Sequence, residues 1–387
     1  MLTVSSHIRF IGVEDDNLDL FEGQYPLTRG ISYNSYLIDD SCIAVVDTVD
    51  YRRFDEWLER LEFSLAGRKP DYLIIQHVEP DHSGCIGRFV ELYPEAKIVA
   101  TAKATEMITN FFEDIDFSGK MIAVKDGETL NLGSSEVRFI TAPMVHWPEV
   151  MMTLHVGDGV LFSADAFGTF AMYSSDEAWD DEARRYYCNI VGKYGSSVQA
   201  VMKKLTGLPF SVIAPLHGPV LRDNLARYWQ LYDKWSRYEP ASDGVLVAYA
   251  SIYGGTAKAA RRLCGMLEEA GIDVVEPLDL CRHDVSYAVA AAFKYRRMVL
   301  CSVTYDGDMF PAMHNFIHHI AAKGLRNRSV GLVENGAWAP LAAKKMTAAL
   351  EAMHDMQIVT PAVTLRCALH TSDDAALREM ASNMAKS

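Results

Sequence analysis

The sequence lacks the cysteine pairs that hold disulfide-rich domains, zinc ribbons and iron–sulfur clusters. Its seven cysteines are odd in number and scattered along 387 residues, and no two form a Cys-x-x-Cys pair. Isolated buried thiols in a reducing compartment are therefore their expected state. No uncharged apolar stretch approaches the roughly 20 residues that a membrane-spanning helix needs. Residues 1–10 show no basic segment followed by an apolar one, so we expect no secretory signal and a cytoplasmic protein.

Basic residues are also few. The chain has 51 acidic against 37 basic residues and a net charge of −14, which argues against nucleic acid or an acidic membrane surface as a partner. Residues 243–387 carry fifteen acidic and fifteen basic residues, so the whole excess lies in residues 1–242. The length allows two or three domains. Because the polar stretch YEPASDG at 238–244 holds both proline and glycine, we expect two domains, 1–242 and 243–387.

Residues 1–242 alternate predicted strands and helices, as in an α/β protein. Two apolar runs around a polar turn, 32–38 and 42–48, predict a β-hairpin. Helices are expected over 51–66 and 178–204. The other expected strands are 72–76, 97–100, 121–124, 136–141, 151–156, 160–163 and 211–216. Two sheets sandwiched between helices would fit this order.

The pattern becomes regular after residue 244. Strands are expected at 245–250, 273–278, 298–303, 329–334 and 358–363. Helices are expected between them, at 256–270, 284–294, 311–323 and 339–353. Five strands alternating with helices predict a parallel, doubly wound sheet. In such a sheet of order 2-1-3-4-5, ligands bind outside the carboxyl ends of the strands at the switch point.

The segment HVEPDH at 77–82 is the strongest chemical signal. It directly follows a predicted strand and brings His77, Glu79, Asp81 and His82 into six residues of loop. Two imidazoles and two carboxylates this close would be unfavourable in an ordinary core. A bound cation resolves the conflict, because it neutralises the carboxylates and uses the imidazole lone pairs. A solvated loop is the alternative, although the proline and glycine of this segment favour a fixed turn.

Three more candidate ligands stand where predicted strands end, namely His146, Asp165 and His217. Each alone is more often structural, but together they repeat one pattern. Seven ligands are too many for one tetrahedral ion and suit two adjacent ions that share a bridging carboxylate. Three carboxylates and four imidazoles without a thiolate favour iron or manganese over thiolate-bound zinc. His7 and His155 have no such position and stay unassigned.

A second group of candidate binding residues lies near the start of the predicted second domain. The segment VLVAYASIYGGTAKAA at 245–260 predicts a strand, a loop of small residues and a helix. The loop offers hydroxyls and unhindered N–H groups at a helix N-terminus, which suits a phosphate. Its candidate residues are Ser251, Tyr253, Gly254, Gly255 and Thr256.

Two further loops support a flavin site. No Walker lysine and no Gly-x-Gly-x-x-Gly is present, which disfavours ATP and dinucleotides. The loops 302–310 and 334–340 follow the third and fourth predicted strands, and Tyr305 and Trp338 offer flat surfaces to an isoalloxazine ring. A simple glycine-containing turn is the alternative for the first loop.

The first half resembles the metallo-β-lactamase-like fold, whose hydrolases carry His-x-His-x-Asp-His in this loop. Glu79 in place of the second histidine resembles the diiron branch, the flavodiiron proteins or A-type flavoproteins. Four further sequence segments also resemble those of the flavodiiron proteins, namely SYNSYLI at 32–38, APMVHWPEVM at 142–151, LFSADAFG at 161–168 and HGPVLR at 217–222. The resemblance covers essentially the whole chain. It implies an α/β protein, with an αββα sandwich followed by a flavodoxin-like, doubly wound parallel sheet of five strands.

The resemblance also implies site residues. One iron would be held by His77, Glu79 and His146, the other by Asp81, His82 and His217, with Asp165 bridging the pair. Many members have histidine where this sequence has Phe170, which changes hydrogen bonding and proton supply near the metals. The second half resembles flavodoxin, which binds FMN noncovalently. Its matching loop residues are Ser251, Thr256, Ser302, Thr304, Tyr305, Asp306, Gly307, Asn335, Gly336 and Trp338.

Together these features imply a flavodiiron oxidoreductase that reduces dioxygen to water, nitric oxide to nitrous oxide, or both. The resemblance implies a head-to-tail homodimer, or a dimer of dimers, in which each FMN faces the partner chain's diiron centre. It also implies an external electron donor, commonly a rubredoxin, because no Cys-x-x-Cys domain is fused. We expect Tyr25, Trp147 and Phe170 to shape the substrate pocket. The chief alternative is a metallo-β-lactamase-like zinc hydrolase, and a third is a flavodoxin-like electron carrier.

Overall fold

The chain folds into two compact units. The structure is a computed structural model and describes residues 2–175, 179–274 and 277–387. The first unit extends to Tyr187 and includes Ser196–Asp233, and the second comprises Cys188–Gly195 and Lys234–Ser387. The domain boundary expected after residue 242 stays a prediction. In the described part of the chain, no helix combines the length and the apolar character needed to cross a membrane.

The first unit contains a seven-stranded sheet. In spatial order its strands are β1 (Leu2–Thr3), β2 (Ile8–Phe10), β7 (Tyr36–Ile38), β8 (Ala44–Val46), β9 (Tyr72–Ile74), β10 (Lys97–Thr101) and β11 (Met121–Val124). Strands β7 and β8 pair antiparallel, which confirms the predicted hairpin. Strands β8 to β11 run parallel and therefore need crossover connections. The helices α1 (Phe54–Leu65), α3 (Ile86–Leu92) and α4 (Ala102–Phe111) lie in these connections.

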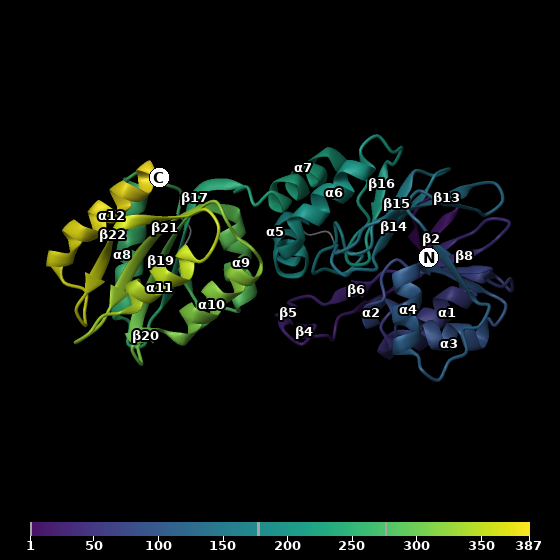
Figure 1. Cartoon of the computed structure of the whole chain (residues 1–387), viewed down its shortest axis with the longest axis horizontal. Coiled ribbons are helices and arrows are strands. Elements are labelled where there is room, and N and C mark those ends of the chain that lie inside the picture. The colour runs from purple at the N-terminus through teal and green to yellow at the C-terminus, as the bar shows by residue number, and fades with distance from the viewer. Residues whose placement is uncertain (1, 176–178, 275–276) are drawn as a thin grey trace. The chain divides into compact units, whose positions relative to one another are not determined.

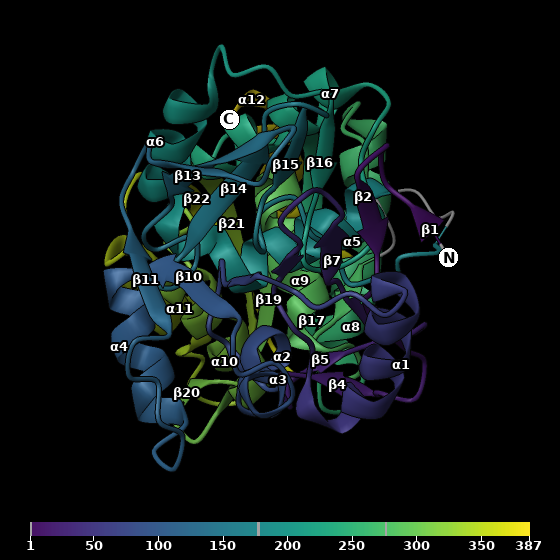
Figure 2. The ribbon, with the colours of Figure 1, turned by 90° about the vertical axis from the view of Figure 1, so that its right-hand side faces the viewer.

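A second, five-stranded sheet packs against the first. Its strands are β12 (Thr129–Asn131), β13 (Glu136–Thr141), β14 (Met151–His155), β15 (Val160–Phe162) and β16 (Val212–Ala214). One buried core joins the two sheets, with Ile74 and Val99 from the first and Phe139 and Phe162 from the second. Figure 2 shows α1 and α4 beside the first sheet, and α6 (Gly195–Leu205) and α7 (Leu225–Ser236) beside the second. The expected αββα sandwich is confirmed.

The second unit contains the expected parallel sheet (Figure 1, green to yellow). Its strands lie in the order β18 (Leu278–Asp279), β17 (Ser242–Ala250), β19 (Tyr295–Tyr305), β21 (Arg328–Asn335) and β22 (Met356–Leu365). This is the predicted order 2-1-3-4-5, and every neighbouring pair along it is parallel. The short strand β20 (Asp308–Met309) folds back antiparallel on β19.

Helices cover this sheet. Helices α8 (Gly255–Glu269) and α12 (Asp374–Lys386) share one core with it, through residues such as Leu263 and Leu377. The remaining crossover helices are α9 (Val285–Lys294), α10 (Pro311–Ala322) and α11 (Ala342–Glu351). Because parallel strands joined by helices bury both faces of the sheet, the carboxyl ends of the strands are left open for a ligand.

Two of the predicted elements differ in the structure. The strand predicted at 273–278 includes residues 275–276, which lie outside the described residues; pairing is seen at β18 and at a bridge between Val245 and Val274. The helix predicted over 178–204, whose first residue also lies outside the described part, is interrupted. α5 (Trp179–Tyr186) continues into a π-helical turn (Tyr187–Val191) and a 3-10 turn (Gly192–Tyr194) before α6 begins. At Gly195 a Cβ would lie 2.2 Å from the carbonyl oxygen of Ser236, so this close backbone approach requires glycine.

Candidate metal centre and flavin cavity

The loop after β9 is a tight turn that carries four predicted ligands, His77, Glu79, Asp81 and His82. The short helix α2 (Pro80–Ser83) begins inside it. The Ser83 hydroxyl donates a hydrogen bond to the carbonyl oxygen of Val78 at 2.8 Å. A Cβ at Gly84 would lie 2.6 Å from the carbonyl oxygen of Pro80. The loop can close on itself in this way only because residue 84 is glycine.

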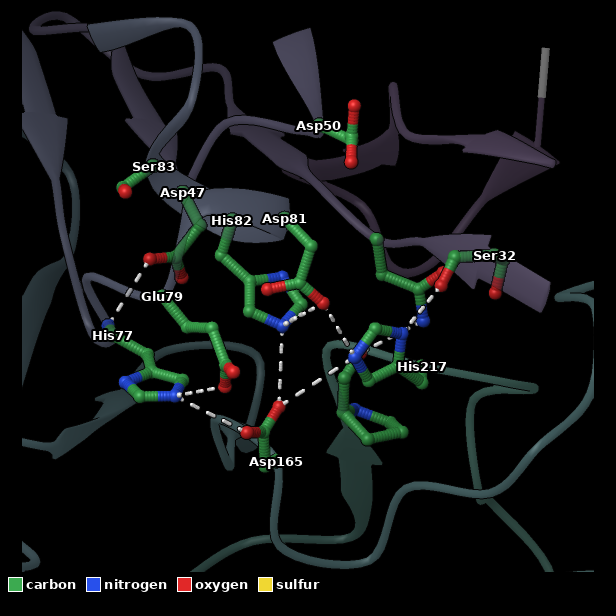
Figure 3. A network of polar contacts seen from close by, with 12 residues as sticks. Ser32, Asp47, Asp50, His77, Glu79, Asp81, His82, Ser83, Asp165 and His217 are labelled. Atoms are coloured by element: carbon green, nitrogen blue, oxygen red, sulfur yellow. Dashed lines mark hydrogen bonds and ion pairs between the residues drawn. The ribbon is translucent and has the colours of Figure 1, made fainter. Parts of the chain in front are cut away.

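The other three predicted ligands come from the second sheet. His146 follows β13, Asp165 follows β15 and His217 follows β16. Strands β13 and β15 are both antiparallel to β14, and β16 is parallel to β15. The carboxyl ends of β13, β15 and β16 therefore lie at one edge of the sheet. Asp165 and His217 point toward the side chains of the α2 loop there (Figure 3).

The seven side chains form two groups. His77, Glu79, His146 and Asp165 offer ligand atoms within 4.8 Å of one another, and so do Asp81, His82 and His217. The Oδ2 atom of Asp165 lies 3.3 Å from His77 Nε2 and 3.1 Å from His146 Nε2. Its Oδ1 atom lies 3.2 Å from His82 Nε2 and 3.8 Å from His217 Nε2. One carboxylate thus faces both groups.

Each group also has a carboxylate of its own. Oε2 of Glu79 lies 3.2 Å from His77 Nε2 and 3.1 Å from His146 Nε2. Oδ2 of Asp81 lies 3.3 Å from the Nε2 atoms of both His82 and His217. Each candidate ion position is therefore surrounded by two imidazoles, one carboxylate that belongs to that group alone, and one oxygen of Asp165.

The second group contains buried polar atoms that lack partners. Among the described residues, no hydrogen bond satisfies the Asp81 carboxylate oxygens, the His82 ring nitrogens, His217 Nε2 or Asp165 Oδ1. These atoms face one another at 3.2–3.3 Å, as in the pairs of His82 with Asp81 and Asp165, without hydrogen-bond geometry. Each unsatisfied buried group costs about 1–3 kcal/mol. A divalent cation between them would use the free lone pairs, so the donor set fits a metal ion.

The ionisation of these groups is interdependent. Burial alone would raise the pKa of Asp165, but the charge on His77 and the close contacts with the rings of His146 and His82 hold this pKa well below its usual value. Burial alone would lower the pKa of His146, yet Asp165 and Glu79 raise it to about 9. Despite burial, hydrogen bonds from His146 and His77 lower the pKa of Glu79 to about 2. Without a cation, protons on the imidazoles balance the carboxylates, and a cation would displace them.

Residues behind the groups orient the imidazoles, and the sequence reasoning missed them. Oε1 of Glu149 lies 2.7 Å from His77 Nδ1 and also accepts from the N–H of Val78 at 3.1 Å. The carbonyl oxygen of Ser32 lies 2.8 Å from His217 Nδ1. Both contacts leave the Nε2 atom facing the carboxylates. Glu149 stands in the phrase APMVHWPEVM, so a carboxylate three residues after His146 was an available signal.

Asp47 supports the backbone that leads into the α2 loop. It is fully buried and accepts from the backbone N–H of Gln76 at 2.8 Å, and more weakly from that of His77 at 3.4 Å (Figure 3). Burial raises the pKa of Asp47 to about 6, although the charge on His82 and the Gln76 hydrogen bonds oppose the rise. This carboxylate holds the backbone from which His77 projects.

Aromatic rings enclose much of the centre. Phe21 packs edge-on against His217 at 5.2 Å, and Trp147 packs against His77 at 5.2 Å. Phe170 lies 5.0 Å from the ring of Tyr186, and the guanidinium of Arg185 lies 4.7 Å from the centre of the Phe170 ring. Phe170, the position at which the resemblance leads one to expect histidine, is therefore packed between a tyrosine ring and a guanidinium group.

Two tyrosines complete these surroundings. Tyr25 lies 5.6 Å from Phe170. The hydroxyl of Tyr186, which sequence reasoning missed, is buried without a hydrogen-bond partner in the described part of the chain. Its ring lies 5.7 Å from that of His217. Burial, followed by the negative charge of Asp165, raises the pKa of Tyr186 well above its usual value, so the hydroxyl keeps its proton.

The second unit contains a cavity of about 580 Å³ at the carboxyl ends of its strands. Eleven of the thirteen predicted cofactor residues line it, namely Ser251, Tyr253, Gly255, Thr256, Thr304, Tyr305, Asp306, Gly307, Asn335, Gly336 and Trp338. Gly254 and Ser302 do not. Ser302 is buried and accepts from the backbone N–H of Phe310 at 3.1 Å. The volume lies within the range of about 300–1,000 Å³ typical of small-molecule sites.

Some side chains that line the cavity already form hydrogen bonds within the protein. The Thr304 hydroxyl accepts from the N–H groups of Leu341 and Ala342 at 2.9 and 3.1 Å, so it fixes the start of α11. The side-chain amide of Asn335 donates to the carbonyl oxygen of Cys367 at 3.0 Å. Trp338, by contrast, has 88% of its surface exposed, which leaves a flat ring for stacking. Lining residues that the sequence reasoning missed are Ile252, Val303, Ala337, Ala339, Leu341 and Cys367.

Comparison with known proteins gives consistent matches. A sequence model described as "ODP family beta lactamase" matches residues 31–218. The chain is 29% identical over 364 residues to the anaerobic nitric oxide reductase flavorubredoxin of Salmonella arizonae, covering 90% of this chain and 75% of that protein. The rubredoxin oxygen:oxidoreductase of Desulfovibrio gigas superposes with a TM-score of 0.92 at 26% identity, covering 99% of this chain and 97% of that one. The flavodiiron protein of Giardia intestinalis shares the fold, with a TM-score of 0.92 at 23% identity and coverages of 100% and 96%.

These matches confirm the resemblance stated from the sequence. The metallo-β-lactamase-like and flavodoxin-like parts occur together along the whole chain, as in the matched structures. The relatives are oxidoreductases rather than zinc hydrolases, so the hydrolase alternative is set aside and the chain is an oxidoreductase. In sequence and fold the chain is therefore similar to flavodiiron proteins.

Proposed function

We propose that the chain reduces dioxygen to water, nitric oxide to nitrous oxide, or both, with two iron ions and one FMN. The observation that carries the proposal is the position of Asp165, whose two carboxylate oxygens face two separate groups of histidines. A flavin-sized cavity on the same chain supports it. The names of the relatives, a nitric oxide reductase and a rubredoxin oxygen:oxidoreductase, support both substrates.

The proposed ligands follow from the two groups. One iron would be held by His77, Glu79 and His146, and the other by Asp81, His82 and His217, with Asp165 shared. This set of oxygen and imidazole ligands without a thiolate suits iron. Most of these side chains are buried, and a buried carboxylate without a positive partner is costly. A bound cation would provide that partner and would replace the protons on the imidazoles.

The proposed FMN would lie in the cavity of the second unit. The start of α8 at Gly255 offers free N–H groups to its phosphate. The exposed rings of Tyr305 and Trp338 offer stacking surfaces to the isoalloxazine. Thr304 and Asn335 would act mainly by fixing the loops, since both already bond to the backbone.

The electron count fits the two cofactors. A ferrous pair supplies two electrons and a reduced flavin two more. The fully reduced protein therefore stores the four electrons that, with four protons, turn one dioxygen molecule into two waters. Two electrons and two protons turn two nitric oxide molecules into nitrous oxide and water. The chain's own part is to hold the ligands in place. Glu149 and the Ser32 carbonyl keep the Nδ1 protons of His77 and His217, which leaves Nε2 of each ring directed at the centre.

Partners and location stay proposals. Because relatives are named a rubredoxin oxygen:oxidoreductase and a flavorubredoxin, we propose that electrons come from a carrier of the rubredoxin type. We also propose a head-to-tail homodimer and a cytoplasmic location. Residues 1–242 remain the proposed metal-bearing domain and 243–387 the proposed FMN domain.

Metal analysis of variants tests the assignment. Asp165→Ala should lose both irons, because both groups use this carboxylate, whereas His217→Ala should keep about half of the wild-type iron. Asp223→Ala, at an exposed position, is the matched control and should bind as the wild type does. Iron and flavin are measured per chain after anaerobic reconstitution. Full iron in Asp165→Ala, or zinc without flavin in the purified wild type, would refute the proposal.

A further inference from the structure

A second cavity lies beside the flavin cavity in the second unit. Its volume is about 510 Å³, and Tyr305 and Asp306 line both cavities. The rest of its lining comes from β20 and one face of α10 and takes no part in the proposed flavin site. Two imidazoles and two carboxylates are among the lining groups, so its chemistry differs from that of the flavin cavity.

The imidazoles come from one face of α10. His314 and His318 both line the cavity, one helical turn apart. The opposite face holds the buried residues Met313, Phe316, Ile317 and Ile320, which fixes the rotation of the helix about its axis. Side chains four residues apart on a helix stand about 5–6 Å from each other. Helical zinc sites use this His-x-x-x-His spacing because two imidazoles can then reach the same ion.

Neither imidazole has a polar partner in the described part of the chain, and the ring of His318 lies 5.9 Å from that of His319. Both side chains are exposed. The neighbouring His319 differs, since its Nδ1 atom lies 2.8 Å from the carbonyl oxygen of Asn315. His319 does not line the cavity. The two lining histidines are therefore free to bind a ligand, and His319 is an internal control.

The carboxylates come from the turn between β19 and β20. Tyr305 pairs with Asp308 across this turn, and Asp306 and Gly307 adopt left-handed backbone conformations with φ of 50° and 73°. The turn therefore presents Asp306 and Asp308 to the same cavity. The nearest cation to Asp308 is Lys345, at 3.8 Å, and both side chains are about half exposed. An exposed pair this long contributes little, so it would not hold Asp308 against a stronger ligand.

We propose that His314 and His318, with Asp306 and Asp308, bind a divalent transition-metal ion of the zinc type. Imidazole and carboxylate ligands without a thiolate suit Zn²⁺, Ni²⁺ or Cu²⁺ better than Ca²⁺ or Mg²⁺, which prefer oxygen alone. The ligand atoms are not among the described groups already gathered within 4.8 Å. The site therefore forms when the ion binds, by rotation of exposed side chains between staggered rotamers.

Occupancy would place positive charge next to the flavin cavity, through the shared Tyr305 and Asp306. Charge near a flavin changes its electronics. Of the four proposed ligands only Asp306 also lines the flavin cavity, so zinc binding by the two histidines does not depend on the reductase function.

Zinc titration of the full-length, iron-loaded protein tests the proposal. Isothermal titration calorimetry of the wild type is compared with His314→Ala, His318→Ala and the double variant, with His319→Ala as the matched control. Iron content is measured before and after, so that zinc entering the iron centre is recognised by released iron. Because these side chains are exposed, the variants should fold, which circular dichroism checks.

The wild type and His319→Ala should bind one zinc ion without loss of iron. Each single variant should bind it at least about tenfold more weakly, since loss of even an outer partner of a metal ligand costs about that much. The double variant should show no such binding. Coincident isotherms for the wild type and the double variant would overturn the proposal, as would zinc uptake that occurs only with release of iron. Neither result would bear on the reductase function, which is tested separately.

Discussion

Oε1 of Glu149 lies 2.7 Å from Nδ1 of His77, and both side chains are fully buried. This contact determines which ring nitrogen of His77 carries the proton and therefore which one faces the candidate metal position. The same carboxylate oxygen accepts from the N–H of Val78, so it also fixes the backbone of the α2 loop. Glu149 touches none of the other predicted ligands in the described contacts.

We expect Glu149→Ala to weaken metal binding without removing a ligand. Loss of a partner behind a metal-bound histidine typically costs about 10–100-fold in affinity. Competition with a chelator of known affinity measures the change. Glu91→Ala, at a side chain that is 58% exposed, is the control and should bind as the wild type does. An unchanged affinity in Glu149→Ala would show that His77 does not need this partner.

Two glycines of α8 make a matched pair for the flavin cavity. A Cβ at Gly255 would lie 2.7 Å from the carbonyl oxygen of Cys367 and 3.1 Å from the side-chain amide of Asn335, whereas a Cβ at Gly265 would meet nothing within 4 Å. Gly255→Ala should therefore displace the cavity wall and weaken FMN binding. Gly265→Ala should keep FMN affinity and stabilise the helix by about 0.5–1 kcal/mol. Quenching of FMN fluorescence measures the affinity. Equal FMN affinities for the two variants would contradict the claim that a side chain at position 255 displaces the cavity wall.

The pair of His7 and Asp158 predicts a pH-dependent contribution to stability. The ring Nδ1 of His7 lies 2.9 Å from Oδ1 of Asp158. The hydrogen bond to Asp158, with the charges of Asp158, Asp40 and Asp39, raises the pKa of His7 despite some burial. Burial alone would raise the pKa of Asp158, but hydrogen bonds from Ser5, His7 and Ser6 lower it. The buried ring of His155 lies 5.9 Å away, and burial lowers its pKa.

The direction of the pH effect follows from these shifts. Stabilisation from a raised histidine pKa is complete below the ordinary value of 6.5 and is lost as the pH rises through the folded-state pKa. Stabilisation from a lowered Asp158 pKa is present above 3.8 and is lost in stronger acid. His7→Gln should therefore destabilise the protein more at about pH 5.5 than at about pH 8.5. Urea unfolding at both values, with exposed His354→Gln as control, measures this, and equal effects at the two values would count against it.

Arg328 is a buried cation without a carboxylate partner in the described contacts. Its guanidinium donates only to backbone carbonyl oxygens, those of Ala292, Phe293, Tyr238, Arg326 and Asn327, at 2.8–3.1 Å. Burial lowers the pKa of Arg328 to about 10, which still keeps the charge at neutral pH. The side chain thus joins the end of α9 to the chain around Tyr238.

We expect Arg328→Met to lower the free energy of unfolding by about 3 kcal/mol, because several buried carbonyl groups lose their donor. Arg378→Met removes an exposed ion pair with Glu269 and should cost within about 0.5 kcal/mol. Guanidinium unfolding curves compare the two variants. A loss of stability in Arg328→Met no larger than in Arg378→Met would mean that other donors replace the guanidinium.

The candidate ligands could be predicted because each carries a local signal. His77, His146, Asp165 and His217 all follow a strand, and the strands themselves show apolar runs that end at turns. The partners behind the ligands could not be predicted in this way. Glu149 lies 72 residues from His77, and Ser32 lies 185 residues from His217. Only the packing of the two sheets brings such positions together.

The helices of the second half were mostly predicted, whereas α3, α4 and α7 of the first half were not. Helix α8 follows the glycines of its loop and ends within a residue of the expectation, and α9 has Asp284 as its N-cap. Helix α12 was not predicted, although its buried residues Leu377, Met380, Ala381 and Met384 repeat with the helical period. The break near residue 187 was not predicted; α6 resumes at Gly195, where a Cβ would lie 2.2 Å from the carbonyl oxygen of Ser236.

The central claim is that this protein uses flavin and iron together to reduce a diatomic gas. Anaerobic stopped-flow mixing of the fully reduced protein with dioxygen, and separately with nitric oxide, tests it most directly. The account predicts that flavin absorbance returns to the oxidised form with consumption of at least one of the two gases, and that Asp165→Ala, which keeps its flavin, loses the fast reaction. Equal rates of flavin oxidation in the wild type and Asp165→Ala, with both gases, would contradict it.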